Sequence, residues 1–337
     1  MDRRLFLKTG LTTAAFMAGA PVLIAGCRPG LRSRLTAESL SVPTEIPGLT
    51  SDGHQILHYA SLAPSGHNSQ PWIVRIKGPD HWIIGLDPHR QLSVVDGHNF
   101  EALLSIGSFL ENLVQAAAAY GYRVHPATLA TDRFDTDVVS LRLEKTRPEK
   151  MDLQRLVSRR TVKSHFSDRQ LTAEDVTAFT RLADDHLFYF PAGTRHAGLM
   201  AEQAVENYIL QMKNTEAVQE MARWTRLKNA DITARRDGLT PDGMEIHGLA
   251  GWYVRHFMDP ADVTGTTFVN KGIEKIRGLS QQGAGWLVIT GDGHTPADLV
   301  ASGRRCQRMA LEAKARRVAI HPMSQTLEED RGQTHIR

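Results

Sequence analysis

Apolar residues recur along this chain with two different periods, and each period predicts an element. A helical period runs from about Phe100 to Tyr120, with Leu103 and Leu110 on its apolar face and Gly121 as its stop. A second long helical run is expected from about residue 195 to 227. Alternating or continuous apolar runs predict strands at 72–76, 82–86, 138–143, 187–190 and 286–290.

Two segments lack this periodicity. Residues 28–47 are rich in Ser, Thr, Pro and Gly, which predicts a tether ahead of the folded part. Residues 224–262 carry a high density of Gly and Pro, which predicts an irregular excursion. This excursion is either a lid over a site or a surface loop with no gating role.

The stretch from Ala63 to Trp72 (APSGHNSQPW) combines a helix stop, exposed backbone donors and two amides. Pro64 biases the preceding residue away from helical geometry, so the helix before it should end there. Ser65 exposes its backbone N–H, and Asn68 and Gln70 each carry donors and an acceptor. The set suits a flat polar ring, although an ordinary Asn/Ser/Gly turn has the same composition.

This stretch resembles the flavin-contacting motif of the nitroreductase superfamily, and specifically of its Acg-type members, in which two nitroreductase halves are fused. The resemblance implies that Pro64, Ser65, Asn68 and Gln70 contact the isoalloxazine and ribityl part of FMN.

A basic segment a hundred residues later is similar to the Arg-Arg-Ser/Thr motif of the same superfamily. The resemblance implies that Arg159, Arg160, Thr161 and Lys163 bind FMN, the basic pair taking its phosphate and pyrimidine edge. Guanidinium groups, a hydroxyl and a helix terminus are suited to an anionic phosphate. A solvated basic helix end is the alternative.

One motif lies in each half, so the resemblance implies an α+β pseudo-dimer with one FMN: two fused halves, a central helical core and flanking antiparallel sheets. The halves are expected at 48–150 and 151–337, in a monomeric chain. Residues 107–126 and 303–322 also align without a gap, each with the pattern of helix, turn and strand. Chance similarity between two Ala-rich helices is the other explanation.

The N-terminus predicts export. Arg3-Arg4 with the apolar run to Gly26 resembles a twin-arginine signal peptide, and Ile24-Ala25-Gly26-Cys27 is similar to a bacterial lipobox. Residues 1–27 are therefore expected to be a signal, with lipid on Cys27 and the protein anchored on the periplasmic or cell-surface side of a bacterial membrane. A plain signal peptide with an incidental Cys, or an uncleaved anchor, would share this pattern.

Composition and motif content exclude several kinds of partner and site. The chain is 41% hydrophobic with a formal net charge of +3 and has no dense basic run, so a nucleic-acid partner is not expected. Metal-binding and nucleotide-loop motifs are absent from the sequence, and its fifteen His residues are scattered, so neither a metal nor a catalytic acid or base is assigned. Cys306, in a helical pattern, is expected to be a buried structural thiol.

The resemblance implies a flavoprotein oxidoreductase that passes hydride or electrons from a reduced donor through FMN to a quinone- or nitroaromatic-like acceptor. NAD(P)H is not expected outside the cytoplasm, so a different reductant, such as a quinol or a redox partner, would have to supply the electrons, and the sequence does not identify it. Two alternatives remain: an FMN-sequestering protein with little turnover, and a scaffold that has lost FMN. The polar tail after Glu328 departs from the family, which has an apolar strand there, and puts flavin affinity in doubt.

Overall fold

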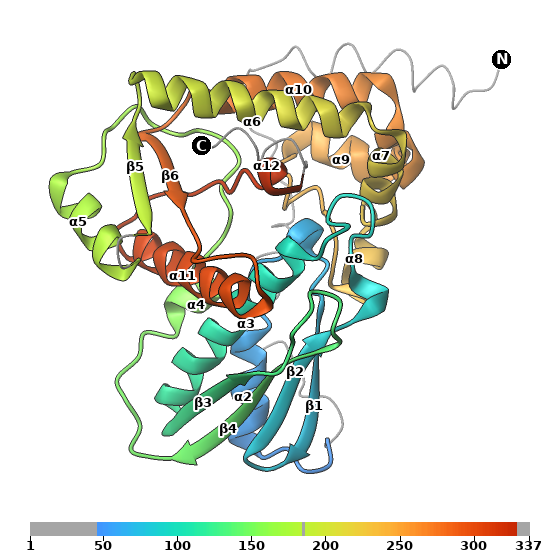
Figure 1. Ribbon diagram of the computed structural model, residues 1–337. Coiled ribbons are helices and arrows are strands. Elements are labelled where there is room, and N and C mark those ends of the chain that lie inside the picture. The colour runs from blue at the N-terminus through green and yellow to red at the C-terminus, as the bar shows by residue number, and fades with distance from the viewer. Residues whose placement is uncertain (1–45, 184–185, 329–337) are drawn as a thin grey trace.

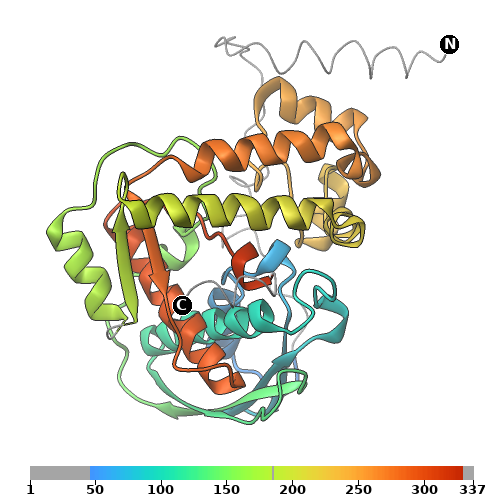
Figure 2. The same ribbon diagram turned by 45° about the horizontal axis from the view of Figure 1, so that its top comes forward.

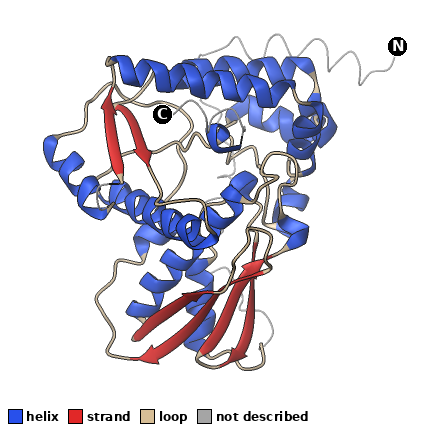
Figure 3. Cartoon of the chain, viewed as in Figure 1, coloured by secondary structure: helices blue, strands red, loops and turns tan. Residues whose placement is uncertain are grey.

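The computed structural model describes residues 46–183 and 186–328, which form a mixed α+β fold with antiparallel sheets (Figure 1). The predicted signal, Cys27, nearly all of the tether and the polar tail lie outside the described residues. Figure 3 shows the strands gathered in two places, with helices between and above them.

A four-stranded sheet forms the lower part of the molecule in Figure 1. Its strands follow the order β1-β2-β4-β3 and are all antiparallel to their neighbours. The predicted strands at 72–76, 82–86 and 138–143 are confirmed as β1 (Trp72–Gly78), β2 (His81–Leu86) and β4 (Asp137–Lys145). The fourth strand is β3 (Tyr122–Thr128).

Helices α2 (Ser51–Ala60) and α3 (Phe100–Ala119) pack on this sheet around a core that includes Trp82, Ile84 and Phe109. The predicted helix and its stop are confirmed, since Gly121 follows α3 with φ +76°. Within the described residues α3 alone is long and apolar enough to cross a membrane, but 72% of its apolar window is buried in the protein. It is therefore the core helix of the part of the fold that contains the four-stranded sheet.

The second part of the chain contains one antiparallel pair, β5 (Leu187–Pro191) with β6 (Gly285–Ile289), which confirms both predicted strands. The other elements of this part are α4 (Gln154–Ser158), α5 (Ala173–Leu182), α6 (Arg195–Lys213), α7 (Thr215–Arg223), α8 (Asn229–Arg235), α9 (Gly248–Phe257), η5 (Pro260–Thr264), α10 (Thr266–Ser280), α11 (Pro296–Ala315) and α12 (Gln325–Glu328). The 3₁₀ turns η3 (Gly66–Asn68) and η4 (Pro88–Arg90) lie earlier in the chain, after α2 and after β2.

Two predictions about the second part need correction. The single helix expected over 195–227 is two helices, because Asn214 has extended backbone and its side chain accepts hydrogen bonds from the N–H groups of Glu216 and Ala217 at the start of α7. The segment 224–262 is not irregular throughout: it contains α8, α9 and η5, and only residues 236–247 lie outside helices between α8 and α9.

Helices α3 and α11 cross in the middle of the molecule (Figure 1). A Cβ atom at Gly107 would overlap the Val300 carbonyl oxygen, and one at Gly303 would overlap the Leu104 carbonyl oxygen. The two glycines therefore let the backbones touch.

The contacts around this crossing follow the gap-free alignment of residues 107–126 with 303–322. Glu111 contacts Arg308 at 3.6 Å, and Asn112 accepts a 2.7 Å hydrogen bond from Gln307. The alignment equates Glu111 with Gln307 and Asn112 with Arg308, so the two contacts are equivalent under it. Both helices span twenty residues. The alignment fails beyond them, because residues 318–324 form no strand where β3 stands in the first half.

Candidate functional site

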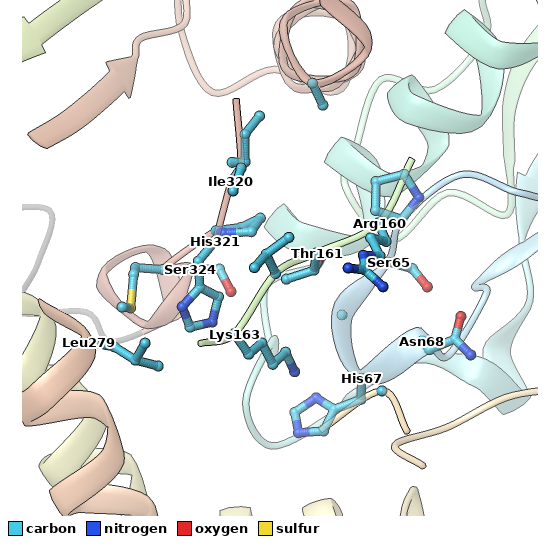
Figure 4. Close-up of a pocket in the computed structure, with 18 of the residues that line it drawn as sticks. Ser65, His67, Asn68, Arg160, Thr161, Lys163, Leu279, Ile320, His321 and Ser324 are labelled. Atoms are coloured by element: carbon cyan, nitrogen blue, oxygen red, sulfur yellow. The ribbon is translucent and has the colours of Figure 1, made fainter. Parts of the chain in front are cut away.

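A single cavity of about 2670 Å³ brings the predicted site residues together. Its walls come from the end of α2, the 159–163 segment, α6, α10, α11 and the stretch 317–328. Figure 4 shows part of this wall in close-up. All eight predicted FMN-contacting residues line the cavity: Pro64, Ser65, Asn68, Gln70, Arg159, Arg160, Thr161 and Lys163.

The loop after α2 has an unusual backbone. His67, Asn68 and Gln70 have φ values of +48°, +51° and +54°, a region that non-glycine residues seldom occupy. The Ser65 hydroxyl oxygen stabilises the turn by accepting a 2.9 Å hydrogen bond from the backbone N–H of Gln70. Backbone strain of this kind concentrates at binding sites.

The two amides of this loop have partners that the sequence does not reveal. The Gln70 amide nitrogen donates to the Arg236 carbonyl oxygen at 2.7 Å, and the Asn68 amide nitrogen donates to the Gly238 carbonyl oxygen at 3.4 Å. The Gly238 N–H returns a 3.1 Å bond to the Asn68 carbonyl oxygen. Both amides therefore fasten the loop to residues 236–238 while lining the cavity.

A buried ion network holds residues 236–238 in place. Asp237, 8% exposed, accepts from the Arg226 Nε at 3.0 Å and from an Arg90 guanidinium nitrogen at 3.3 Å. Arg90 also donates to the Ser69 carbonyl oxygen at 3.0 Å, so the network reaches the loop directly. The Arg226 guanidinium lies 5.6 Å from the Trp224 ring centre.

The second motif follows α4 as an extended segment. Arg159 has extended backbone and ends the helix, and the Val162 N–H donates to the Ile320 carbonyl oxygen at 3.0 Å. Figure 4 shows Lys163 between His67 and His321, which belong to different parts of the chain. Figure 4 also shows Arg160 near Ser65, so the basic segment and the 63–70 loop meet at the same part of the cavity.

Positive charge dominates this part of the cavity. Burial, followed by the Lys163 charge, lowers the pKa of His67 to about 4, and burial together with Lys163 and Lys275 does the same for His321. Both imidazoles are therefore neutral at pH 7.

Glu245 is the carboxylate inside this cationic group. Its burial favours a raised pKa, but hydrogen bonds from Ser164 and the Lys163 N–H, with the charges of Lys275 and Arg160, hold the pKa below its usual range. Burial lowers the pKa of Lys275, and Glu245 opposes that shift. One carboxylate thus faces several cations, which leaves the region suited to an anion.

A buried polar atom also points to a missing partner. The Nδ1 atom of His321 makes no hydrogen bond with any part of the chain that the structure describes. A ligand in the cavity would satisfy it.

A carboxyl pair lies on the other side of the loop. Glu101, at the start of α3, is so close to Gly66 that a Cβ atom there would overlap its Oε2. Its pKa is raised well above the usual range by burial, then by the charges of Glu328 and Asp96, and Glu101 is hydrogen-bonded to Glu328 and Ser324. Two carboxyls in such contact favour the form in which they share a proton.

Sequence reasoning missed Glu101, Glu245 and Lys275. None of them belongs to a local motif, and each reaches the cavity from an element distant in sequence. Cys306 lies in α11 as predicted, at the cavity wall, and burial raises the pKa of its thiol to about 11. Within the described residues no group of three or more His, Cys, Asp or Glu side chains has the arrangement of a metal site.

Comparison with known proteins adds nothing to these observations: no protein-family model and no curated protein matches this chain.

Proposed function

We propose that this chain is an FMN-dependent oxidoreductase of the nitroreductase type. The observation that carries the proposal is the meeting of residues 64–70 with the basic segment 159–163 at one cavity. The two segments come from different parts of the chain, and each has the chemistry that one end of FMN requires.

The α3 and α11 crossing supports a pseudo-dimeric, nitroreductase-like architecture. Two helices of equal length that touch through aligned glycines, with side-chain pairs exchanged by the same alignment, are expected of two fused copies of one unit. On this proposal residues 48–150 and 151–337 are the two halves.

The residues present fit FMN. Arg159, Arg160, Thr161 and Lys163 would hold the phosphate, because guanidinium, ammonium and hydroxyl donors suit its charge. The strained loop would face the ring, with Pro64 and Ser65 at its surface. The cavity exceeds the roughly 300–1,000 Å³ typical of a small-molecule site, so it has room for FMN and a substrate.

Bound FMN would supply two-electron transfer between a donor and a quinone- or nitroaromatic-like acceptor. Whichever of Arg160 and Lys163 does not bind the phosphate would stabilise negative charge that develops on the ring. Glu101, whose Oε2 lies beside Gly66 and whose pKa is raised by burial and by Glu328, would be the carboxyl nearest the loop that favours its protonated form.

An FMN-sequestering protein is the second candidate. The observation that favours it is the fastening of Asn68 and Gln70 to residues 236–238, which closes the loop against a wall of the cavity. Turnover would require that wall to admit a second molecule.

The proposal also includes location and donor. Export by the twin-arginine pathway and lipid on Cys27 would place the domain outside the cytoplasm, where a quinol or a redox partner, not NAD(P)H, would be the electron donor.

The test is an FMN titration of the full chain purified in detergent, followed by visible absorption and anaerobic reduction. Stoichiometric FMN that a quinol bleaches and a quinone or nitroarene restores supports the oxidoreductase. FMN that only dithionite bleaches supports sequestration. A chain that binds no FMN at excess refutes both.

A further inference from the structure

The outer face of α9 carries an uncovered apolar stripe. We define the α9 stripe as Leu249, Trp252, Tyr253, His256 and Phe257, which follow the i, i+3, i+4 spacing of one helix face. Leu249 is 59% exposed, Trp252 50% and Phe257 37%. A surface helix normally turns such a face inward, so this stripe needs a partner.

The four rings of the stripe contact one another, and the stripe contains no Asp, Glu, Lys or Arg. Its ring centres lie 5.0 Å apart for Trp252 and His256, 5.3 Å for Trp252 and Phe257, and 5.4 Å for Tyr253 and Phe257. Arg255, the cation nearest in sequence, is directed to Asp242 instead, at 2.6 Å. The outward face of α9 therefore presents four rings and a leucine, with no Asp, Glu, Lys or Arg in the stripe.

We infer that the α9 stripe docks on the surface of the lipid bilayer to which the chain is tethered. Trp and Tyr rings, with an apolar body and a polar edge, are the side chains that favour the interface between lipid and water. A short amphipathic helix with such a face lies flat in that interface.

The chain ahead of the structure identifies lipid as the partner. The predicted lipid-bearing Cys27 is joined to Ile46, the first described residue, by residues 28–45, which span up to roughly 60 Å when extended. This reach lets the domain turn on its tether and bring α9 to the bilayer. This step rests on the proposed lipid anchor: with the domain held at the membrane through Cys27, a small apolar face is sufficient to set its orientation.

Docking would give the cavity a membrane-facing wall. Ile246 and Ala250 line the cavity next to Met221 and Met244, while the stripe faces outward. Figure 1 shows α9 at the end of the molecule opposite the four-stranded sheet. If the proposed flavin function holds, on which this step rests, a lipid-soluble quinone is the substrate class with the shortest route to the site.

The experiment uses Trp252 as its own probe. The full chain, purified in detergent, is reconstituted with vesicles of phosphatidylethanolamine and phosphatidylglycerol, with or without phosphatidylcholine brominated near the head-group end of its acyl chains. Five Trp residues emit, and Trp252 is the half-exposed one among them. Subtracting the emission of the Trp252→Phe variant from that of wild type isolates the emission of Trp252. If the stripe docks on the bilayer, bromolipid should quench most of this emission.

Two double variants control the result. Leu249→Glu with Phe257→Glu should abolish the quenching of Trp252 and leave the chain on the vesicles. The matched pair Leu129→Glu with Phe134→Glu alters exposed apolar residues of the first half, 45% and 57% exposed, and should leave the quenching unchanged.

Two results would overturn the inference: Trp252 emission that bromolipid does not quench in protein that pellets with the vesicles, or a dimer in sedimentation that the stripe variant dissociates. The last would assign the stripe to a second copy of the chain. None of these readouts requires FMN, so failure of the flavin proposal is measured separately by the titration.

Discussion

Two antiparallel strand pairs of this protein, β1 with β2 and β5 with β6, differ in what connects their strands. In the first half Gly78 pairs with His81, so β1 and β2 are joined by a tight turn. In the second, Pro191 pairs with Gly285 in the same antiparallel sense, but residues 192–284 leave the sheet between them and form α6 to α10 (Figure 2). Since loop-closure entropy grows slowly with length, such an insertion is compatible with the strand pairing.

The two parts of the chain contribute differently to stability and to ligand binding. The first half buries a large continuous core between its sheet, α2 and α3. The second half has a smaller core around Phe179 and Leu187, and its insertion walls the cavity. The comparison therefore predicts that changes at the α3 and α11 crossing affect folding, whereas changes in the basic segment affect binding alone.

The largest effect is expected at the helix crossing that joins the halves. Gly303→Leu would drive a side chain into the Leu104 backbone and should destabilise the fold by about 3 kcal/mol or more. Urea unfolding measures this change. Gly198→Ala on α6 is the control, because nothing lies within 4 Å of its added Cβ, and it should raise stability by about 0.5 kcal/mol. Equal effects of the two substitutions would refute backbone contact at the crossing.

The next effect is expected on ligand binding. Arg159→Ala with Arg160→Ala should weaken FMN binding by about 3 kcal/mol, roughly a hundredfold, because two charge-assisted contacts to phosphate are lost. Urea stability should stay close to wild type. Arg169→Ala with Arg181→Ala removes two exposed guanidinium groups away from the cavity and should leave affinity unchanged. Unchanged affinity in the first variant would exclude this segment as the phosphate site.

A smaller effect is expected where the insertion meets the first half. Asp237→Asn leaves the buried Arg226 without its carboxylate and should cost about 2 kcal/mol. Because Asp237 braces residues 236–238 against the loop, limited proteolysis should also cut this segment faster. Asp137→Asn, which loses a partly exposed pair with Arg75, should change stability by less than about 0.5 kcal/mol. If proteolysis of 236–238 is unaffected, the network does not hold the loop.

The sequence predicted these two regions unequally well. In the first half each element has a strong local period, so α3, its stop at Gly121 and the strands were predictable from pattern alone. The insertion has weaker periods and many breakers, and α9 was missed because its apolar stripe faces solvent beside Gly248 and Gly251.

The candidate site shows the same limit. Residue types and spacing predicted the two motifs, and the structure brings both to one cavity. The partners of Asn68 and Gln70, and the roles of Glu101 and Lys275, depend on contacts between residues far apart in the chain. No local pattern encodes such contacts.

The last prediction concerns pH and compares a carboxyl of the first half with an imidazole of the cavity. Burial raises the pKa of Asp96 to about 6, against hydrogen bonds from the α3 backbone that lower it. Its contribution to stability is complete below the unfolded pKa of 3.8 and is lost as pH rises through 6. His67, with its pKa lowered to about 4, stabilises the fold above 6.5 and loses that contribution as pH falls through 4.

These trends oppose each other, and Glu101 and His321 shift in the same directions as Asp96 and His67 respectively. Wild type should therefore have a flat stability profile between about pH 4 and 6.5. Asp96→Asn should make stability fall towards low pH, and His67→Gln should make it fall towards high pH, each by on the order of 1–3 kcal/mol. Urea unfolding across this window measures both slopes. Parallel profiles for the two variants would show that these groups do not set the pH dependence, because opposite slopes follow directly from their opposite charge changes.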